Sequence, residues 1–371
     1  MIGGAYRRWL GNEAIIVPAS SATTWTSVQE HDAVVADPFP RLLGQSGVGI
    51  RHADLAVFQQ PWWLEIARGS AKYRELEVRR DGIVVGSLAF IVVTNRFGNR
   101  LGFPPIWSHL GGPVVSHELN PEDRAAVIRE LIAQLPANIS LRFVCTSASP
   151  DAEVVRLEFE RAGFRHDTEV TYLQYPEDKG ILERLSGESR RQIASAPKRI
   201  EVVDIGADEF IAFYDANLRA AGKQSYAPLR SARDLIVKGR ARDAPQVRVI
   251  AARQAKGAPL DAAIAYAWDN KRYYLWMVTH RRGSDTAHNK PHPHAGKYLI
   301  LDGTEDARRR GLIFDADGAT TEGSQTLYRD RLKFPRAEHR DVFFRDTGMY
   351  ALYKGLRLKL RAQSTKYERG K

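Results

Sequence analysis

The chain has 371 residues, of which 43% are hydrophobic and 27% are charged, and its formal net charge is +11. This length suits two domains of ordinary size, and the normal apolar content excludes a disordered chain. No apolar run reaches the roughly 18 residues of a membrane helix. The positive charge favours polyanionic partners such as RNA, a membrane face or a phosphate-rich substrate.

Cys145 is the only cysteine, which excludes an intrachain disulfide and makes a reducing cytoplasm the expected compartment. It ends the apolar run that begins at Leu141, and this position predicts a core thiol rather than a nucleophile. The N-terminus contains Arg7 and Arg8 but only a brief apolar patch, which does not match a signal peptide.

Residues 1–50 are predicted to form an irregular lead-in to a first domain over 51–176, which begins with a helix at 58–67 that buries Trp62 and Trp63. Arg80-Asp-Gly82 predicts a tight turn between two strands. Asn120 and Pro121 predict the N-cap and first residue of a second helix. The expected strands are 73–78, 83–93, 141–145 and 170–175, and the later helices are 121–135 and 152–161.

Residues 177–206 are predicted to form a basic helical connector, with a helix that ends before Pro197. A second domain over 207–349 repeats the element order of the first, which indicates a duplicated module. Its expected helices are 208–220 and 231–238, and its expected strands are 247–252, 262–268 and 273–279.

The stretch from 273 to 334 organises the second domain. The strand at 273–279 leads into a loop from His280 to His294, a helix at 296–310 closed by Gly311, and a short buried strand at 312–314. A turn at 315–318, a helix to Leu332 and a strand at 341–345 follow, and residues 350–371 are expected to form a helix and a basic tail. Strand, helix and strand in this order predict two parallel strands joined by a crossover. The N-terminus of such a helix can hold an anion.

This element order resembles the GNAT acyltransferase fold. Two copies in one chain resemble the Fem-type peptidyltransferases and the BioF2-like or cellulose-biosynthesis-type acetyltransferases. The local matches are Phe58-Gln-Gln-Pro-Trp-Trp-Leu64, Leu185-Ser-Gly-Glu-Ser-Arg-Arg-Gln-Ile193 with Lys198, His294 through Asp315, and Leu327-Tyr-Arg-Asp-Arg-Leu-Lys-Phe334.

The resemblance implies an α/β (α+β) fold of two tandem GNAT-like domains, each with a mixed sheet whose central strands splay apart. The splay is expected to bring a backbone N–H to the oxyanion that forms when an amine attacks an activated acyl carbon. We expect the splayed pair near residues 273 to 315. Arg331 stands where the Fem segment carries a lysine, and Lys333 follows it. Arginine can stabilise a developing negative charge but is too basic to shuttle a proton at neutral pH. The glycine-rich loop of acetyl-CoA-binding relatives is not evident, and the nearest segment, His292 to Gly296, has one glycine.

Three residues are predicted to be catalytic, namely Arg331, Asp315 and His294. Asp315 and Asp317 follow a strand end and are candidates to hold the acceptor ammonium or accept its proton, although Asp-x-Asp-Gly is also an ordinary turn. The residues predicted to hold the donor phosphates are Arg190, Arg191, Lys198, Lys223, Lys297, Arg329 and Lys333. The alternative for the first four is a solvated charged surface.

The substrate groove is predicted to include Tyr226, Tyr266, Trp268, Asp317 and Tyr328, although strand alternation places at least one of these aromatic rings in the core. The loop contains four histidines whose spacing does not match that of metal ligands, namely His280, His288, His292 and His294. No metal is therefore expected. One of these histidines is instead expected to contact substrate or to act as a base, and His294 is best placed.

The leading hypothesis is an N-acyltransferase or aminoacyltransferase that forms an amide bond on a small-molecule or cell-wall-like primary amine, with no tightly bound cofactor. The basic surface favours aminoacyl-tRNA as the donor, and acyl-CoA is the alternative donor. The competing hypothesis is a binding protein that has kept the fold and lost the chemistry.

Overall fold

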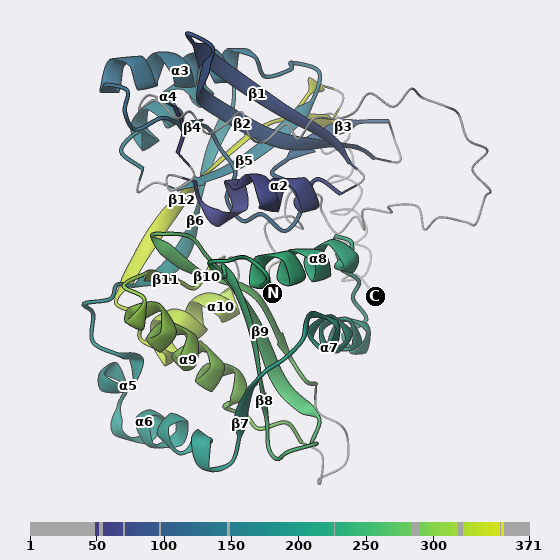
Figure 1. Cartoon of the computed structure of the whole chain (residues 1–371), viewed down its shortest axis with the longest axis vertical. Helices are drawn as coiled ribbons and strands as arrows, with labels where there is room; N and C mark the ends of the chain where they lie inside the picture. Colours follow the sequence, from purple (N-terminus) through teal and green to yellow (C-terminus); the bar gives the residue numbers. More distant parts are fainter. Residues whose placement is uncertain are drawn as a thin grey trace, which may run out of the picture.

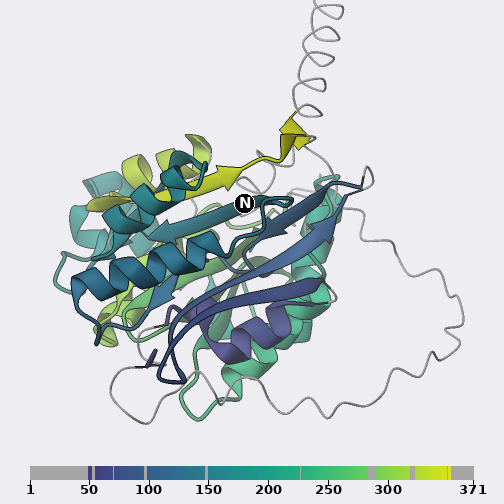
Figure 2. The ribbon, with the colours of Figure 1, turned by 90° about the horizontal axis from the view of Figure 1, so that it is seen from above.

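The computed structural model describes residues 49–51, 55–69, 71–95, 98–146, 149–225, 227–282, 290–317, 322–348 and 350–351. Within them, one continuous mixed sheet has the strand order β1-β2-β3-β5-β12-β6-β11-β10-β9-β8-β7, with β4 paired to β2 beside this path (Figure 1). Helices lie on both faces of the twisted sheet (Figure 2). The predicted α/β architecture with a mixed sheet is confirmed. The lead-in to residue 48 and the tail beyond 351 lie outside the described residues.

The first half follows the predicted order closely. Asp81 and Gly82 both have positive φ, 51° and 80°, and form the tight turn between β1 and β2. The Asn120 side chain accepts a hydrogen bond from the Asp123 N–H at 2.9 Å, as an N-cap does. The elements are α2 (Pro61–Ala67), β1 (Lys72–Arg80), β2 (Ile83–Thr94), β3 (Arg100–Phe103), β4 (Val114–Val115), α3 (Pro121–Ala133), β5 (Ser140–Thr146), α4 (Ala152–Arg161) and β6 (Arg165–Gln174).

The connector and the second half also follow the predicted order, with two differences. Residues 201–204 of the connector form a strand, and the final helix is a short α-helix continued by a π-helical turn, Thr326–Arg331. The elements are α5 (Ile181–Arg184), α6 (Gly187–Ala194), β7 (Glu201–Asp204), α7 (Ala207–Ala220), α8 (Leu229–Arg240), β8 (Val247–Arg253), β9 (Leu260–Trp268), β10 (Arg272–His280), α9 (Ala295–Arg309), β11 (Ile313–Asp315), α10 (Glu322–Gln325) and β12 (Arg336–Arg345).

The last strand of the described residues, β12, crosses from the second half into the first. β12 lies between β5 and β6, antiparallel to both, with Phe343 opposite Phe143 on one side and His166 on the other. In Figure 1 the yellow β12 runs beside the teal β6. β6 in turn pairs with β11 of the second half. The two halves therefore share one hydrogen-bonded sheet.

Each half contains a parallel pair of strands that diverge. β3 pairs with β5 only at Leu101–Ser140 and Gly102–Leu141. The ladder then ends, because Pro104 and Pro105 follow β3 and have no N–H to donate. β10 pairs with β11 over Arg272 to Tyr274, after which β10 continues to His280 with a described strand partner only on its β9 side. The pairing of β10 with β11 thus ends at Tyr274 and Asp315, within the stretch where the splay was predicted.

A β-bulge in β10 accounts for the second divergence. Leu275 lies opposite Tyr266 and Met277 lies opposite Ala265, so Trp276 is an extra residue in the strand. Such an insertion bends and twists the strand that carries it. It turns β10 away from β11 immediately beyond their last paired residues.

Four tryptophans pack between the first half and the second. Trp63 and Trp276 are fully buried with ring centroids 4.8 Å apart, and Trp107 packs against Trp276 at 6.4 Å. The Trp276 indole N–H donates to the Trp107 carbonyl at 3.0 Å, and the Trp62 indole reaches Gln246 at 3.1 Å. This core confirms that Trp62 and Trp63 serve packing. No helix among the described residues is long and apolar enough to span a bilayer.

Candidate functional site

The N-terminus of α9 lies at the open end of the second splay. His294 is its N-cap residue, and Gly296 follows in the first turn. A Cβ atom on Gly296 would lie 1.9 Å from the His280 ring, so the helix can approach the end of β10 only because this residue is glycine. His280 and Gly296, which lie at opposite ends of the predicted loop, therefore come into contact.

Positive charge gathers at this helix end. The pKa of Lys297 is lowered by burial and, to a smaller extent, by the charge of Arg331, so the two predicted site residues act on each other electrostatically. The pKa of His294 is lowered by burial and by Lys297 and His292. Both shifts favour the neutral forms, and an anion placed here would reverse the repulsion. The helix N-terminus adds partial positive charge to the same place.

The basic connector approaches this cluster through Arg199. The pKa of His292 is lowered by burial and by the charge of Arg199, while Asp261 acts in the opposite direction. Asp261 is itself paired with Arg281 at 2.5 Å. Among the described residues, no group of three or more His, Cys, Asp or Glu side chains is placed to hold a metal ion, and His288 lies outside them.

The remaining predicted cations are spread over the surface. Arg190 donates to the carbonyls of Glu183 and Leu185, and Arg329 is paired with Asp330 at 2.9 Å. Lys333 has positive φ, and its carbonyl accepts from Arg184. The exposed residues of this set are Arg190, Arg191, Lys198, Lys223, Arg329, Arg331 and Lys333. Only Arg331 of these seven is shown to interact with the α9 cluster.

Asp315 and Asp317 lie in a buried ion network rather than in an open groove. Asp315 has no exposed surface and accepts hydrogen bonds from Thr171 at 2.5 Å, Arg272 at 3.0 Å and Arg340 at 2.7 Å. Burial opposes its charge, but Arg340 and Arg272 outweigh burial and hold its pKa below the usual range. Asp317 is paired with Arg340 and contacts the His109 ring.

This network corrects the role expected for the two aspartates. Asp315 ends β11 rather than starting a turn, and the Asp317 N–H also donates to it. A carboxylate with four donors and no exposed surface cannot receive a substrate ammonium. The network instead joins β6, β10, β11 and β12, because Arg272 also binds Glu338 at 2.8 Å.

The aromatic residues predicted to line the groove belong to the core. Tyr266 is fully buried, and its hydroxyl donates to the Leu299 carbonyl at 2.7 Å. Trp268 stacks on Tyr273 at 5.1 Å, and Tyr328 packs against Phe334 at 5.6 Å. These contacts replace the predicted substrate contacts. Tyr226 lies outside the described residues.

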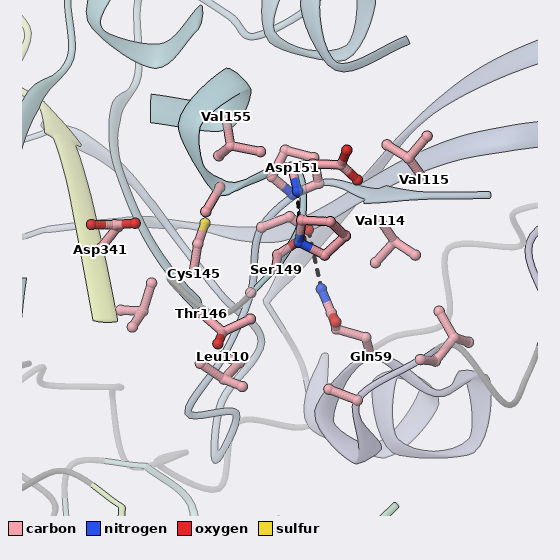
Figure 3. A pocket seen from close by; sticks show the side chains of 18 of the residues that line it. Gln59, Leu110, Val114, Val115, Cys145, Thr146, Ser149, Asp151, Val155 and Asp341 are labelled. Carbon is pink, nitrogen blue, oxygen red and sulfur yellow. Dashed lines mark hydrogen bonds between the residues drawn. The ribbon is translucent and has the colours of Figure 1, made fainter. Parts of the chain in front are cut away.

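The first splay, which the sequence analysis left without a role, contains a cavity of about 240 Å³ (Figure 3). Its walls are the segment from Leu110 to Val115, the end of β5, the first turn of α4 and the turn between β9 and β10. Cys145 lines it from the face of the sheet covered by α3 and α4, and Val144 lines it from the opposite face. The cavity therefore lies along the end of β5, next to the segment that pairs with β5 through Gly111 and Val144.

Gly112 sets the width of this cavity. A Cβ atom on it would lie 2.3 Å from the Cys145 sulfur. The Gln59 side chain, from the 3-10 turn Val57–Gln59 that precedes α2, donates to the Gly112 carbonyl at 3.1 Å (Figure 3). The sequence signal for this site was the pair Gly111-Gly112 after a proline-rich stretch, because adjacent glycines mark close backbone approach. Burial raises the pKa of Cys145, in agreement with a core thiol.

No model of a known protein family and no curated protein matches the sequence. Solved structures do match the fold. FemX is 11% identical, with 78% of this chain and 92% of FemX covered and a TM-score of 0.53. The C-terminal domain (DUF2156) of a protein named as a lysylphosphatidylglycerol synthetase from Agrobacterium fabrum is 13% identical, with 81% and 91% covered and a TM-score of 0.51.

A tandem GNAT protein from the clavulanic acid biosynthesis pathway is 16% identical, with 80% and 89% of the two chains covered and a TM-score of 0.46. The two matches above 0.5 establish that this chain shares its fold with FemX and with the DUF2156 domain. The resemblance to tandem GNAT proteins of the Fem type, derived from element order, is confirmed at the level of the fold.

Proposed function

We propose that the protein is an N-acyltransferase or aminoacyltransferase that joins an activated acyl group to a primary amine, with the donor held at the N-terminus of α9. The observation that supports this proposal is the positive charge at the N-terminus of α9, where the charge of Arg331 acts on Lys297. Within the described ranges neither of these cations forms an ion pair with a carboxylate, and together with the N-terminus of the helix they suit the phosphates of a donor.

The reaction requires few catalytic residues. A neutral amine attacks the acyl carbon, the bond from that carbon to the donor's oxygen or sulfur breaks, and the amine loses one proton. A lowered pKa keeps His294 neutral near pH 7, so it is able to accept that proton. Lys297 and Arg331 then face the leaving donor and stabilise its charge.

Aminoacyl-tRNA is the donor that the charge balance favours. The net charge of +11 suits a long polyanion, and Arg199 extends the cationic surface from α9 towards the connector. One structural neighbour is named as a synthetase of a lysyl phospholipid, which provides a precedent for an aminoacyl group on this fold. Acyl-CoA is the second candidate donor, because its phosphates suit the same cluster.

The test is a screen of the purified chain against charged tRNAs and acyl-CoAs with a panel of primary amines, read by mass spectrometry of the amide product. Lys297→Ala with Arg331→Ala should abolish product and reduce the slope of log K for tRNA against log salt by about 1.5 to 2. Arg308→Ala is the matched control, because Arg308 lies on the same helix but is paired with Glu305.

A non-catalytic binding protein predicts a different outcome. The observation that favours it is that the carboxylate of Asp315 accepts hydrogen bonds from Arg272 and Arg340. This carboxylate is therefore not free to act in the second splay. Tight binding of tRNA or coenzyme A without turnover with any donor would favour this alternative. Turnover that is unaffected by the double substitution would exclude the α9 cluster as the donor site.

A further inference from the structure

A second, smaller cavity adjoins the one at the first splay. It has a volume of about 20 Å³, enough for a single water-sized group. The two cavities share six wall residues, among them Gln59, Gly111 and Gly112. The small cavity ends against β1 and β2, where Glu75 and Ser87 line it.

Glu75 is a carboxylate held in place by neutral donors. One of its oxygens accepts from the Ser87 hydroxyl and the other from the Tyr73 hydroxyl, both at 3.0 Å. Each oxygen has a further lone pair. Burial raises the pKa of Glu75, and the two hydrogen bonds only partly oppose this effect.

The neighbouring carboxylates have cations of their own. Asp151, in the wall of the larger cavity, is paired with Arg124 at 2.8 Å, and Asp341 is paired with His166 at 2.8 Å. Glu77, two residues along β1, is paired with Arg79. No Lys, Arg or His within the described ranges forms an ion pair with Glu75. A half-buried carboxylate in a cavity without a cation is an incomplete site.

The larger cavity also carries a positive charge. Lys271, in the turn between β9 and β10, lines it and has no ion-pair partner in the part of the chain that the structure describes. The adjacent Arg272 is committed to Asp315 and Glu338. The segment from Gly111 to Val115 contributes glycine, proline and valine to the wall. Asp269 also lines the larger cavity, but it accepts hydrogen bonds from the backbone N–H groups of Val57, Lys271 and Arg272. The two cavities together therefore offer the carboxylate of Glu75 in the smaller one and the ammonium of Lys271 in the larger one.

We propose that these joined cavities bind a linear molecule with a primary ammonium at one end and an anionic group at the other. The ammonium occupies the small cavity and donates to Glu75 and Ser87. The alkyl chain passes Gly111 and Gly112, and the anionic end reaches Lys271. The volume lies below the roughly 300–1,000 Å³ of pockets for drug-sized ligands, so the ligand is small and narrow.

This inference does not depend on acyl transfer, because it concerns equilibrium binding in cavities whose walls do not include Lys297 or Arg331. If the protein does transfer acyl groups, this position identifies the class of amine that it recognises. Loss of the α9 cluster should leave this binding intact, so failure of one proposal is distinguishable from failure of the other.

Isothermal titration of the full chain with linear ω-amino carboxylates, from 4-aminobutanoate to 8-aminooctanoate, tests the proposal. We expect one chain length to bind best, and the alkanoate of the same length, which lacks the ammonium, to bind at least about tenfold more weakly. The alkylamine of that length should lose affinity for lack of a partner for Lys271. Equal binding of acid and amino acid, or no binding of any member at millimolar concentration, would overturn the proposal.

Substitutions of Glu75 and Ser87 test where the ammonium of the ligand binds. Glu75→Gln keeps the shape of the side chain and should weaken binding by about tenfold or more, because the hydrogen bond loses its charge. Glu77→Gln is the matched control on the same strand and should bind as the wild type does. Ser87→Ala provides a second, milder variant in case Glu75→Gln fails to fold, and should weaken binding about threefold to tenfold. Unchanged affinity in both Glu75→Gln and Ser87→Ala would contradict the assignment.

Discussion

At the scale of single residues, the approach of Gly112 to Cys145 makes a direct prediction. Gly112→Ala places a methyl group 2.3 Å from the Cys145 sulfur, so the strand or the thiol must move. Overpacking of this kind costs about 1 to 3 kcal/mol. Chemical denaturation should show this loss of stability, and the ω-amino carboxylate that binds best should bind more weakly because the passage narrows.

Two variants control this prediction. Gly187→Ala, at the first position of α6 where nothing lies within 4 Å of the added Cβ, should be neutral or slightly stabilising. Cys145→Ala combined with Gly112→Ala removes the sulfur and should restore part of the lost stability. A double variant as unstable as Gly112→Ala alone would show that the sulfur is not the obstacle.

His109 gives a prediction about pH. Burial, and next the charge of Arg340, lower the pKa of His109 to about 3 from 6.5. Between these values the unfolded chain takes up a proton that the folded chain does not, so stability falls as the pH falls from about 6.5 towards 3. His109→Gln should remove this contribution, which amounts to about 1.4 kcal/mol per pH unit at most.

The measurement is the free energy of unfolding of the wild type and of His109→Gln, taken at several pH values between 7 and 4.5. The difference between the two proteins should change steadily in favour of the variant as the pH falls. A constant difference across this range would mean that His109 titrates normally in the folded protein. The groups that face this ring are Asp315, Asp317 and Arg340.

At the scale of elements, local patterns predicted most of the fold. The turn at Asp81-Gly82, the cap at Asn120 and the glycines at 163 and 311, both with positive φ, mark element ends correctly because each depends on backbone geometry within a few residues. The π-helical turn at Thr326–Arg331 was missed, because its helical period differs from the one used to recognise it.

The candidate site was less predictable than the elements. The resemblance and the helix position pointed to Lys297 and Arg331 as site residues, but the ion pairs of Asp315 with Arg272 and Arg340 could not be predicted, since these arginines come from two other strands. The burial of Tyr266 could not be predicted either, because it depends on the contact of this residue with α9. Glu75 carries no sequence signal, because only the folded hairpin places Ser87 opposite it.

At the scale of the whole molecule, the exchanged strand predicts that neither half folds alone. Residues 51–176 lack β12, which leaves the facing edges of β5 and β6 without the strand that lies between them. We expect this fragment, and residues 207–349 expressed separately, to be insoluble or to lack cooperative unfolding. The full chain should unfold in one transition, because one sheet runs through both halves.

The measurement is circular dichroism and denaturant unfolding of each fragment beside the full chain. Addition of the missing strand through a flexible linker, as residues 51–176 followed by 336–345, should recover part of the native signal of the first half. Two well-separated transitions in the full chain, or a stable fragment without β12, would contradict this expectation.

The position of β12 also has a consequence for synthesis on the ribosome. β5 and β6 leave the exit tunnel well over a hundred residues before β12, the strand that lies between them. Until β12 is synthesised, the facing edges of β5 and β6 in the nascent first half are unpaired. Exposed strand edges invite wrong pairing. Folding of the first half therefore depends on β12, and a premature stop codon just upstream of Arg336 should be as damaging as one near the middle of the message.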